Sequence, residues 1–309
     1  MKATSPIKPI ILIVICTFFW GSSLPMGKEA LGEMQPLSIV FWRFFIAALG
    51  LAAYLLLTHI RMPNLDIKKW LWIIIVSAIG IGGLNFCVFT GLTLTNAANG
   101  SLIMALSPLF TSLIVCIVSR TLPSRAQFLS LFISLFGVLI VLTNGHLDRL
   151  LSMSFNHGDK LIFIGMLAWS MYTYVSGGIN RWIPVLPYTF IGMSTGTIVI
   201  GAMCATSAGP NPFIELWGSS ATGIFEVLYI GLFGTFAGYL MWLNGISKLG
   251  PAKAVLFFNL VPIFSVITAS LLGQKVTELQ VVGIIVVITG LLLPRLPQFK
   301  KQPNMCTKS

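Results

Sequence analysis

Polar and aromatic side chains occur in the middle of several long apolar segments, where they could contact a small molecule. Indole, phenol and amide groups offer hydrogen bonds and ring faces, which bind a substrate without reacting with it. An amide in hydrocarbon costs free energy unless it finds a partner, so Asn85 and Asn259 should face the protein interior. The residues of this kind are Trp20, Ser22, Ser23, Asn85, Trp169, Tyr172, Tyr174, Tyr239, Trp242, Asn244 and Asn259. They predict either a substrate pathway or hydrogen bonds between helices.

Two prolines interrupt apolar segments at corresponding places, Pro108 and Pro262. A proline inside a helix removes one backbone hydrogen bond and leaves the carbonyl four residues earlier without its donor. Those carbonyls belong to Met104 and Phe258. Interrupted helices at matching positions of two halves indicate a binding site near the middle of a membrane, whereas kinks that serve packing alone are the alternative.

Two charged residues fall inside or near the end of apolar segments. Arg43 lies some seven residues after Pro36, so it either extends to the nearer membrane interface or serves as a cationic contact or gate. Glu226 lies close to one end of its segment. It either carries a coupling proton or occupies an interfacial position with a cation beside it.

The sequence shows no pattern of catalytic or metal-binding residues. The three histidines, His59, His146 and His157, lie in expected loops, and no pair of carboxylates lies within an apolar segment. There is no Walker A stretch, and the five cysteines show no CxxC spacing. We therefore expect no enzyme activity, no cofactor and no metal. Any movement of a substrate would depend on its own gradient or on an ion gradient.

Composition places the chain in the membrane. Of its 309 residues, 56% are hydrophobic and only 9% are charged, whereas soluble domains carry about 25% charged residues. The net charge of +11 could suit nucleic acid, but the basic residues lie at the ends of apolar segments, which favours a lipid bilayer as the partner. Backbone groups inside lipid must be satisfied within their own segment, so the spans should be helices.

The apolar segments predict an all-α polytopic membrane protein with ten transmembrane helices. Each is close to the length of about 20 residues that a helix needs to cross a bilayer. The expected spans are Pro9–Met26, Pro36–Thr58, Trp70–Leu94, Asn99–Ser119, Arg125–Thr143, Asp159–Ile179, Leu186–Ser207, Thr222–Asn244, Pro251–Leu272 and Leu279–Leu293.

An internal repeat divides these spans into two sets of five. The stretch Phe89–Pro108 reappears 154 residues later as Leu243–Pro262, and Trp20 in FFWGSS matches Trp169 in LAWSMY. An odd number of spans in each half gives the halves opposite orientations, so we expect two inverted-topology five-helix repeats. The expected boundaries are 9–143 for the first repeat, 144–158 for a polar linker, 159–294 for the second repeat and 295–309 for a basic tail.

The distribution of lysine and arginine predicts the orientation. With the N-terminus inside, fourteen of these residues lie on the cytoplasmic side and four on the outer side, with Arg43 in a span. Because cytoplasmic loops carry an excess of Lys and Arg, both termini should be cytoplasmic.

The motifs resemble the EamA type of the drug/metabolite transporter superfamily. The resemblance covers residues 10–294 as two EamA-like units. In the first half its residues are Trp20–Leu31, Pro36, Arg43–Phe44, Ala98–Pro108 and Gly137. In the second half they are Trp169, Pro251–Ala252, Pro262 and Gly290.

The resemblance implies a ten-helix inner-membrane carrier with a cavity between its halves. Spans one, three, four, six, eight and nine would line the cavity, and members export amino acids and other metabolites. Copies in the family usually carry a Gly-Glu pair after the fourth and ninth spans. Here those places read Ser119-Arg120 and Gly273-Gln274, so no role of that carboxylate is expected.

These expectations combine into a bacterial inner-membrane exporter of a small metabolite, with an amino acid as the first choice. Pro108 and Pro262 would shape the cavity, Asn85 and Asn259 would offer hydrogen bonds, and the tryptophans and tyrosines would stack on the substrate. An importer or exchanger of the same superfamily is one alternative, and a membrane sensor or scaffold is another. The sequence leaves the substrate, the coupling ion, the direction and the oligomeric state open.

Overall fold

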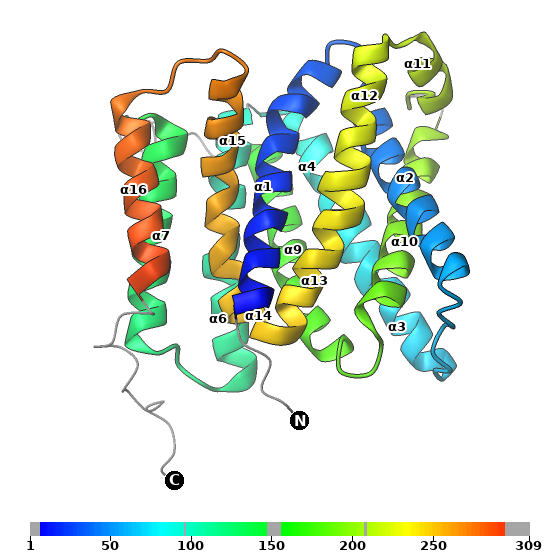
Figure 1. Cartoon of the computed structure of the whole chain (residues 1–309), viewed down its shortest axis with the longest axis horizontal. Helices are drawn as coiled ribbons and strands as arrows, with labels where there is room; N and C mark the ends of the chain where they lie inside the picture. The colour runs from blue at the N-terminus through cyan, green and yellow to red at the C-terminus, as the bar shows by residue number, and fades with distance from the viewer. Residues whose placement is uncertain (1–6, 96, 147–155, 207–208, 294–309) are drawn as a thin grey trace.

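The computed structural model describes residues 7–95, 97–146, 156–206 and 209–293, and this part of the chain is a bundle of helices without strands (Figure 1). The first half contains α1 (Ile7–Ala30), α2 (Pro36–Leu57), α3 (Ile67–Ser77), η1 (Ala78–Gly83), α4 (Leu84–Leu92), α5 (Ala97–Ala105), α6 (Ser107–Ser119) and α7 (Arg125–Thr143). The second half contains α9 (His157–Ile179), α10 (Val185–Cys204), α11 (Pro212–Gly218), α12 (Ala221–Tyr229), η2 (Ile230–Ala237), α13 (Gly238–Leu249), α14 (Pro251–Ala254), η3 (Val255–Leu260), α15 (Val261–Leu271) and α16 (Glu278–Leu292).

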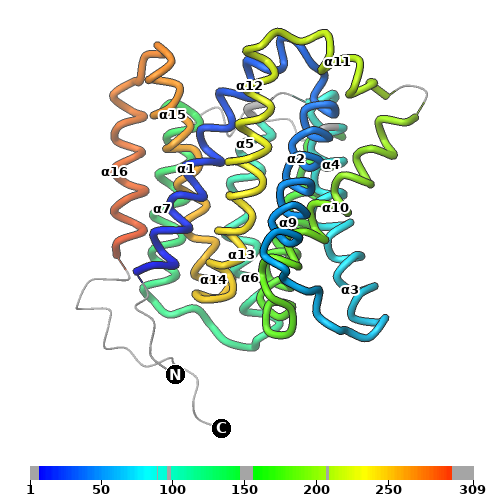
Figure 2. Tube along the Cα trace, turned by 45° about the vertical axis from the view of Figure 1, so that its right-hand side comes forward, coloured from blue at the N-terminus to red at the C-terminus, as the bar shows by residue number. Residues whose placement is uncertain are grey.

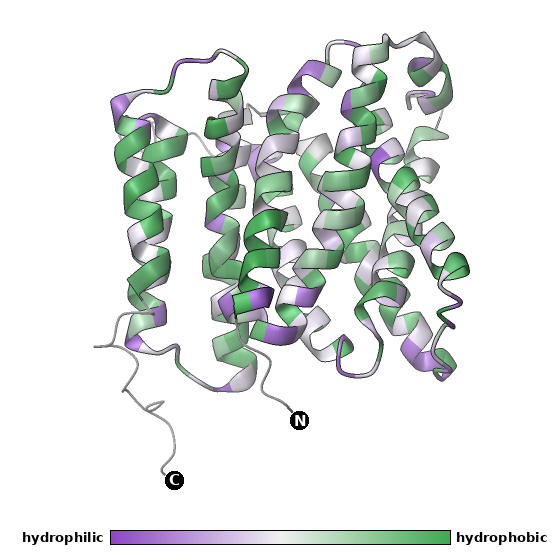
Figure 3. Ribbon diagram, viewed as in Figure 1, coloured by the Kyte–Doolittle hydropathy of each residue, from purple (hydrophilic) through white to green (hydrophobic). Residues whose placement is uncertain are grey.

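Nine helices or helical runs in the described residues are long and apolar enough to cross a membrane, and α16 is a shorter apolar helix. They confirm the all-α polytopic class. Hydrophilic residues gather at the two ends of the bundle, and hydrophobic residues occupy the middle (Figure 3). This is the pattern of a protein whose helices meet lipid along their length and water at their ends.

Four predicted spans are interrupted rather than continuous. The third passes through the π-helix η1, the eighth passes through the π-helix η2, and the ninth contains the 3-10 helix η3. The fourth breaks at Leu106, the residue directly before α6. Pro108 lies in the first turn of α6. Interrupted segments of this kind are tolerated in membranes only where neighbouring helices cover the altered backbone.

Two end points and one short helix differ from the sequence prediction. Helix α1 runs past the predicted end at Met26 to Ala30, with Pro25 inside it, and the eighth span runs past Asn244 to Leu249. The seven-residue helix α11 was not predicted. Its N-cap Asn211 accepts hydrogen bonds from the N–H groups of Phe213 and Ile214. The predicted linker 144–158 and tail 295–309 fall largely outside the described residues.

Helices α7 and α16 pack along each other at one edge of the molecule (Figures 1 and 2). Their contact is close because Gly137 presents no side chain: a Cβ atom there would lie 2.7 Å from the backbone nitrogen of Val287 and 2.8 Å from the carbonyl oxygen of Gly283. Small residues of this kind let membrane helices approach backbone to backbone.

The remaining helices surround a central core. Helix α1 packs on α13 and α15, α9 packs on α4 and α6, and α2 packs on α10 and η2. Segments from both ends of the chain therefore meet in the middle. In Figure 1, α1 begins and α16 ends at the same end of the bundle, where the α2–α3, α6–α7 and α9–α10 connections also lie. Those connections carry Arg61, Arg120 and Arg181.

Candidate substrate site

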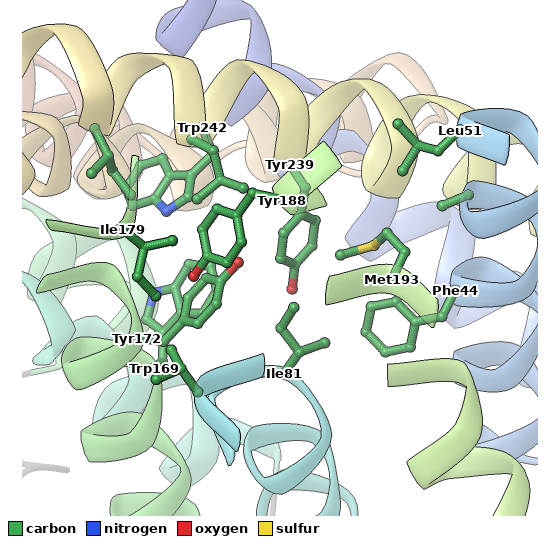
Figure 4. Close-up of a cluster of buried hydrophobic side chains, with 14 of the residues drawn as sticks. Phe44, Leu51, Ile81, Trp169, Tyr172, Ile179, Tyr188, Met193, Tyr239 and Trp242 are labelled. Atoms are coloured by element: carbon green, nitrogen blue, oxygen red, sulfur yellow. The ribbon is translucent and has the colours of Figure 1, made fainter. Parts of the chain in front are cut away.

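Seven aromatic side chains meet in the central core, and we call them the aromatic cluster. Five were predicted as pathway residues, and Tyr188 and Phe258 join them. The members are Trp20 of α1, Trp169 and Tyr172 of α9, Tyr188 of α10, Tyr239 and Trp242 of α13, and Phe258 of η3. The Trp20 ring lies 5.1 Å from that of Trp242 and 5.7 Å from that of Tyr239, between ring centroids. Figure 4 shows Tyr172, Tyr188 and Tyr239 side by side, facing Trp169 and Trp242.

Glycines on the π-helices bring the backbones close enough to hold this cluster. A Cβ on Gly80 of η1 would overlap the Tyr172 side chain, so η1 lies directly against α9. A Cβ on Gly238 would lie 2.7 Å from the Trp20 indole nitrogen. That indole donates a hydrogen bond of 2.7 Å to the Gly234 carbonyl of η2. The altered helices therefore fix the position of Trp20 and Tyr172.

Two indole N–H groups of the cluster have no hydrogen-bond partner within the described part of the chain, those of Trp169 and Trp242. Both side chains are buried, with 3% and 0% of their surface exposed. The two rings are nearly parallel, at 20° and 5.9 Å. A buried donor without an acceptor costs about 1–3 kcal/mol, so the cluster holds unused capacity for an acceptor.

Arg43 is half-buried on α2, next to Phe44 and η2. Its Nε donates to the Thr235 hydroxyl at 3.0 Å, and Thr235 in turn donates to the Ile230 carbonyl at 2.9 Å. The central guanidinium carbon also lies 5.3 Å from the centre of the Phe44 ring. Thr235 of η2 therefore gives Arg43 a polar partner within the bundle.

The predicted amides divide between local and long-range bonds. Asn85 donates to the Ile81 carbonyl at 2.7 Å, within its own helical run. Asn259 donates to the Ser134 hydroxyl of α7 at 2.7 Å. Both side chains are buried, as expected. Asn244 is half-buried, and its side chain forms no hydrogen bond among the described residues.

Each of the two prolines lies directly after an interruption in its helical span. Pro108 is buried in the first turn of α6, and Pro262 is in the first turn of α15, directly after η3. The Phe258 carbonyl was expected to lack a donor, but it accepts the Val261 N–H through the tighter turn of η3. The 3-10 geometry thus satisfies the group that Pro262 leaves without its usual partner.

A line of polar contacts follows α1 along α12 and η2, from the loop after α1 to the aromatic cluster. We call it the α1 seam. Glu33 accepts hydrogen bonds from the N–H and hydroxyl of Ser220, both at 2.6 Å. Further along, Ser22 and Tyr229 share a hydrogen bond of 2.7 Å, and Ser23 lies against Gly234. The seam ends at Trp20.

Glu226 is buried on this seam, with 6% of its surface exposed. A neighbouring cation was one of the two expectations for it, and that expectation is wrong. Within the described structure Glu226 forms no ion pair, and the charges that act on it are those of Glu29 and Glu33.

The sequence prediction also missed a buried carboxylate at the start of α9. Asp159 accepts a hydrogen bond of 2.7 Å from the Thr95 hydroxyl and one of 3.0 Å from the Asn156 N–H. Asn156 and Asp159 form a reciprocal capping box, so the three-residue spacing was the available signal. This network joins the α4–α5 turn to α9. In the described residues, no group of three or more His, Cys, Asp or Glu side chains could hold a metal ion.

Two segments of the chain, residues 7–143 and 156–295, match the sequence profile of the EamA-like transporter family. The chain belongs to this family. It is therefore a multi-pass membrane transporter, as the resemblance indicated. The chain is 32% identical to the uncharacterized transporter YyaM of Bacillus subtilis (strain 168), over 91% of this chain and 92% of YyaM. It is 28% identical to YrdR of the same bacterium, over 93% and 91%.

EamA-like relatives also occur in archaea, and the fold has been seen in a crystal. An uncharacterized transporter of Archaeoglobus fulgidus is 23% identical over 93% of this chain and 96% of its own length. One crystal structure matches with a TM-score of 0.77 at 16% identity, covering 96% of this chain and 100% of that chain. At this identity the likeness establishes the fold alone.

Proposed function

We propose that this chain is a secondary transporter that exports a small metabolite, such as an amino acid, by alternating access between two inverted repeats. The aromatic cluster carries the proposal. It lies in the core, it combines α1 of the first half with α9, α13 and η3 of the second, and it contains two buried donors without acceptors. Aromatic walls with a few directed polar groups are typical of sites for small molecules.

Paired close contacts support the inverted repeats. A Cβ on Gly91 would lie 2.5 Å from Ile162, and a Cβ on Gly245, 154 residues later, would lie 2.7 Å from Ile13. Ile13 precedes Ile162 by the same 149 residues that separate Trp20 from Trp169. A glycine of each half therefore packs against the corresponding isoleucine of the other half. The proposed repeats span residues 9–143 and 159–294, joined by the linker 144–158.

The broken spans support alternating access. The regular α-helix of the fourth span is interrupted at Leu106, and the 3-10 segment of the ninth span ends at Leu260, again 154 residues apart. Pro108 and Pro262 follow two residues later. Breaks near the middle of matching spans allow one half of each helix to tilt while the other stays packed. In this proposal the tilting exposes the cluster to one side of the membrane at a time.

The orientation in the proposal follows the basic residues. Arg61, Arg120 and Arg181 lie at the end of the bundle where α1 begins, and we assign that end to the cytoplasm of a bacterial inner membrane. Helix α16 is the tenth span, and the 295–309 tail is cytoplasmic. Glu226 is the residue for a coupling proton, because burying an ionised carboxylate without a cation costs free energy that proton binding removes.

A whole-cell export assay tests the proposal. Cells with the chain should release at least one metabolite faster than cells without it, and a Trp169→Ala, Asn85→Ala double variant should lose that release at equal expression. Trp72→Ala is the matched control, because Trp72 of α3 is 48% exposed on the outside of the bundle. Unchanged release by the double variant would contradict the site. Net uptake would instead favour an importer or exchanger, and no transport of any metabolite would favour a sensor or scaffold.

A further inference from the structure

The side chain of Arg43 has hydrogen-bonding capacity that the protein does not use. A guanidinium carries five N–H donors in a fixed fork. In the described structure only the Nε–H is bonded, to Thr235, and no carboxylate lies opposite the fork. An unpaired charge inside a bundle is costly and is retained where it binds something. The open end of the fork suits the two oxygens of a carboxylate.

The fork borders the aromatic cluster. The central guanidinium carbon of Arg43 lies 5.3 Å from the centre of the Phe44 ring, and the Phe44 ring lies 6.4 Å from the Tyr239 ring. In Figure 4, Tyr239 lies between Trp242 on one side and Met193 and Phe44 on the other. A molecule with its acidic group at Arg43 would therefore place its body among the rings.

Three buried polar groups of the cluster have no hydrogen-bond partner in the described part of the chain: the indole N–H groups of Trp169 and Trp242, and the Tyr172 hydroxyl, which can donate or accept. The two indoles can only donate. The seven described carboxylates are engaged or placed elsewhere. Asp159 lies at the start of α9 and Asp66 beside Lys69, Glu33 and Glu226 lie on the α1 seam, Glu29 is exposed, Glu215 accepts the N–H of Gln35, and Glu278 begins α16. An ammonium group bound in the cluster would find no carboxylate.

We infer that the aromatic cluster and Arg43 bind an organic anion, a carboxylate joined to an aromatic or other flat apolar body, and that the carboxylate, not a substrate amino group, decides recognition. The inference rests on the proposed function and names the substrate class of that site. An amino acid is then recognised mainly through its carboxylate and its side chain. The same acid without its amino group should bind with similar affinity.

Binding to the full-length chain in lipid nanodiscs tests this directly. The probes are 3-phenylpropionate, its neutral amide, phenethylamine and phenylalanine, measured by calorimetry. We expect 3-phenylpropionate to bind at least about tenfold tighter than phenethylamine, since a charge-assisted hydrogen bond is worth roughly that factor or more. Phenylalanine should bind within about threefold of 3-phenylpropionate. Equal or tighter binding of phenethylamine, or no binding of the acid at millimolar concentration, overturns the inference.

Variants of Arg43 separate charge recognition from folding. Arg43→Gln should weaken 3-phenylpropionate about tenfold to a hundredfold and leave the neutral amide unchanged. Arg43→Lys keeps the charge but loses the fork, so it should retain the preference for acid over amine with a smaller loss. Arg61→Gln, at an exposed cytoplasmic-end position, is the control and should change nothing. Equal loss for acid and amide in both Arg43 variants would show a structural role and overturn the inference.

The two proposals fail separately. If proteoliposomes with the chain transport phenethylamine but not 3-phenylpropionate, the transporter proposal stands and the carboxylate inference falls. If nanodiscs bind the acid with the expected Arg43 dependence, and proteoliposomes and cells transport nothing, the inference stands and the proposed function falls.

Discussion

At the scale of single residues, Asn259 connects the interrupted ninth span to α7. Its amide and the Ser134 hydroxyl are both buried, so each would lose its long-range partner if the other were removed. Interhelical hydrogen bonds in membranes contribute about 0.6 kcal/mol on average and up to about 1.7 kcal/mol. The bond is therefore a modest but measurable link between the two halves of the chain.

A double-mutant cycle measures this link. Asn259→Ala and Ser134→Ala should each lower the free energy of unfolding. The loss in the double variant should be about 0.5–1.5 kcal/mol smaller than the sum of the two single losses. Unfolding in mixed micelles gives the free energies. Asn259→Ala combined with Thr197→Val, whose hydroxyl bonds within α10, should be additive. Additivity in the Ser134 cycle as well would mean that the bond contributes nothing.

Glu33 should make the stability of the α1 seam depend on pH at the end that lies in the loop after α1. The hydroxyl and N–H of Ser220 donate to the carboxylate and hold the pKa of Glu33 below its ordinary value. A group whose pKa is lower in the folded state stabilises that state above its unfolded pKa, and this contribution disappears as the pH falls through the folded value. The seam should therefore loosen in the acid range, below the ordinary pKa of a glutamate.

The Glu33→Gln variant tests the acid dependence. The unfolding temperature of the unmodified chain should fall more steeply below the ordinary glutamate pKa than that of Glu33→Gln, because the variant has no proton to gain there. Glu29→Gln is the control, since Glu29 is exposed and accepts no such pair of hydrogen bonds in the described structure. Parallel pH profiles for Glu33→Gln and the unmodified chain would rule out this role.

At the scale of elements, the contact between α7 and α16 depends on Gly137. Gly137→Leu should destabilise the protein by about 1–3 kcal/mol, because the new side chain meets the backbone of α16, which cannot move aside without separating the helices. Gly178→Ala is the matched control: it adds a methyl group to a helical glycine with nothing within 4 Å. It should be neutral or stabilise by up to about 1 kcal/mol. A Gly137→Leu protein as stable as the control would show that the helices part easily.

Apolar runs predicted the helices because a helix that crosses a lipid bilayer must be both long enough and apolar enough. The break at Pro108 was predictable because proline leaves a mark in the sequence. The π-helices were not, since η1 and η2 differ from an α-helix only in hydrogen-bond register, and their glycines and apolar residues also occur in α-helices that cross membranes. Helix α11 is too short for a periodic pattern.

The candidate site was predicted only in part, because only some of its residues are conspicuous in the sequence. Trp20, Trp169, Tyr172, Tyr239 and Trp242 stand out as aromatic residues at mid-depth, and the structure brings all five together. Tyr188 and Phe258 were missed because nothing in the sequence says which face of a helix points inward. The partner of Arg43 is Thr235, 192 residues away, and no local pattern connects them.

At the scale of the whole molecule, the proposed topology can be tested by labelling. Lys275→Cys, in the exposed α15–α16 connection, should react with a membrane-impermeant maleimide in intact cells. Arg61→Cys should react only after permeabilisation. The comparison needs a background in which the native cysteines are replaced, four of which are unpaired thiols in the described chain. Labelling of both positions from outside would contradict the arrangement of spans.

The two π-helices bear on the history of the chain. A π turn holds one more residue than an α turn, so each marks a place where a helix has absorbed an extra residue. Moving η1 by 154 positions places it inside η2. Under the proposed repeat, one insertion in an ancestral half-length protein, copied when its gene doubled, accounts for both. The widened turn would then be older than the duplication, and half-length relatives should carry it at the same place.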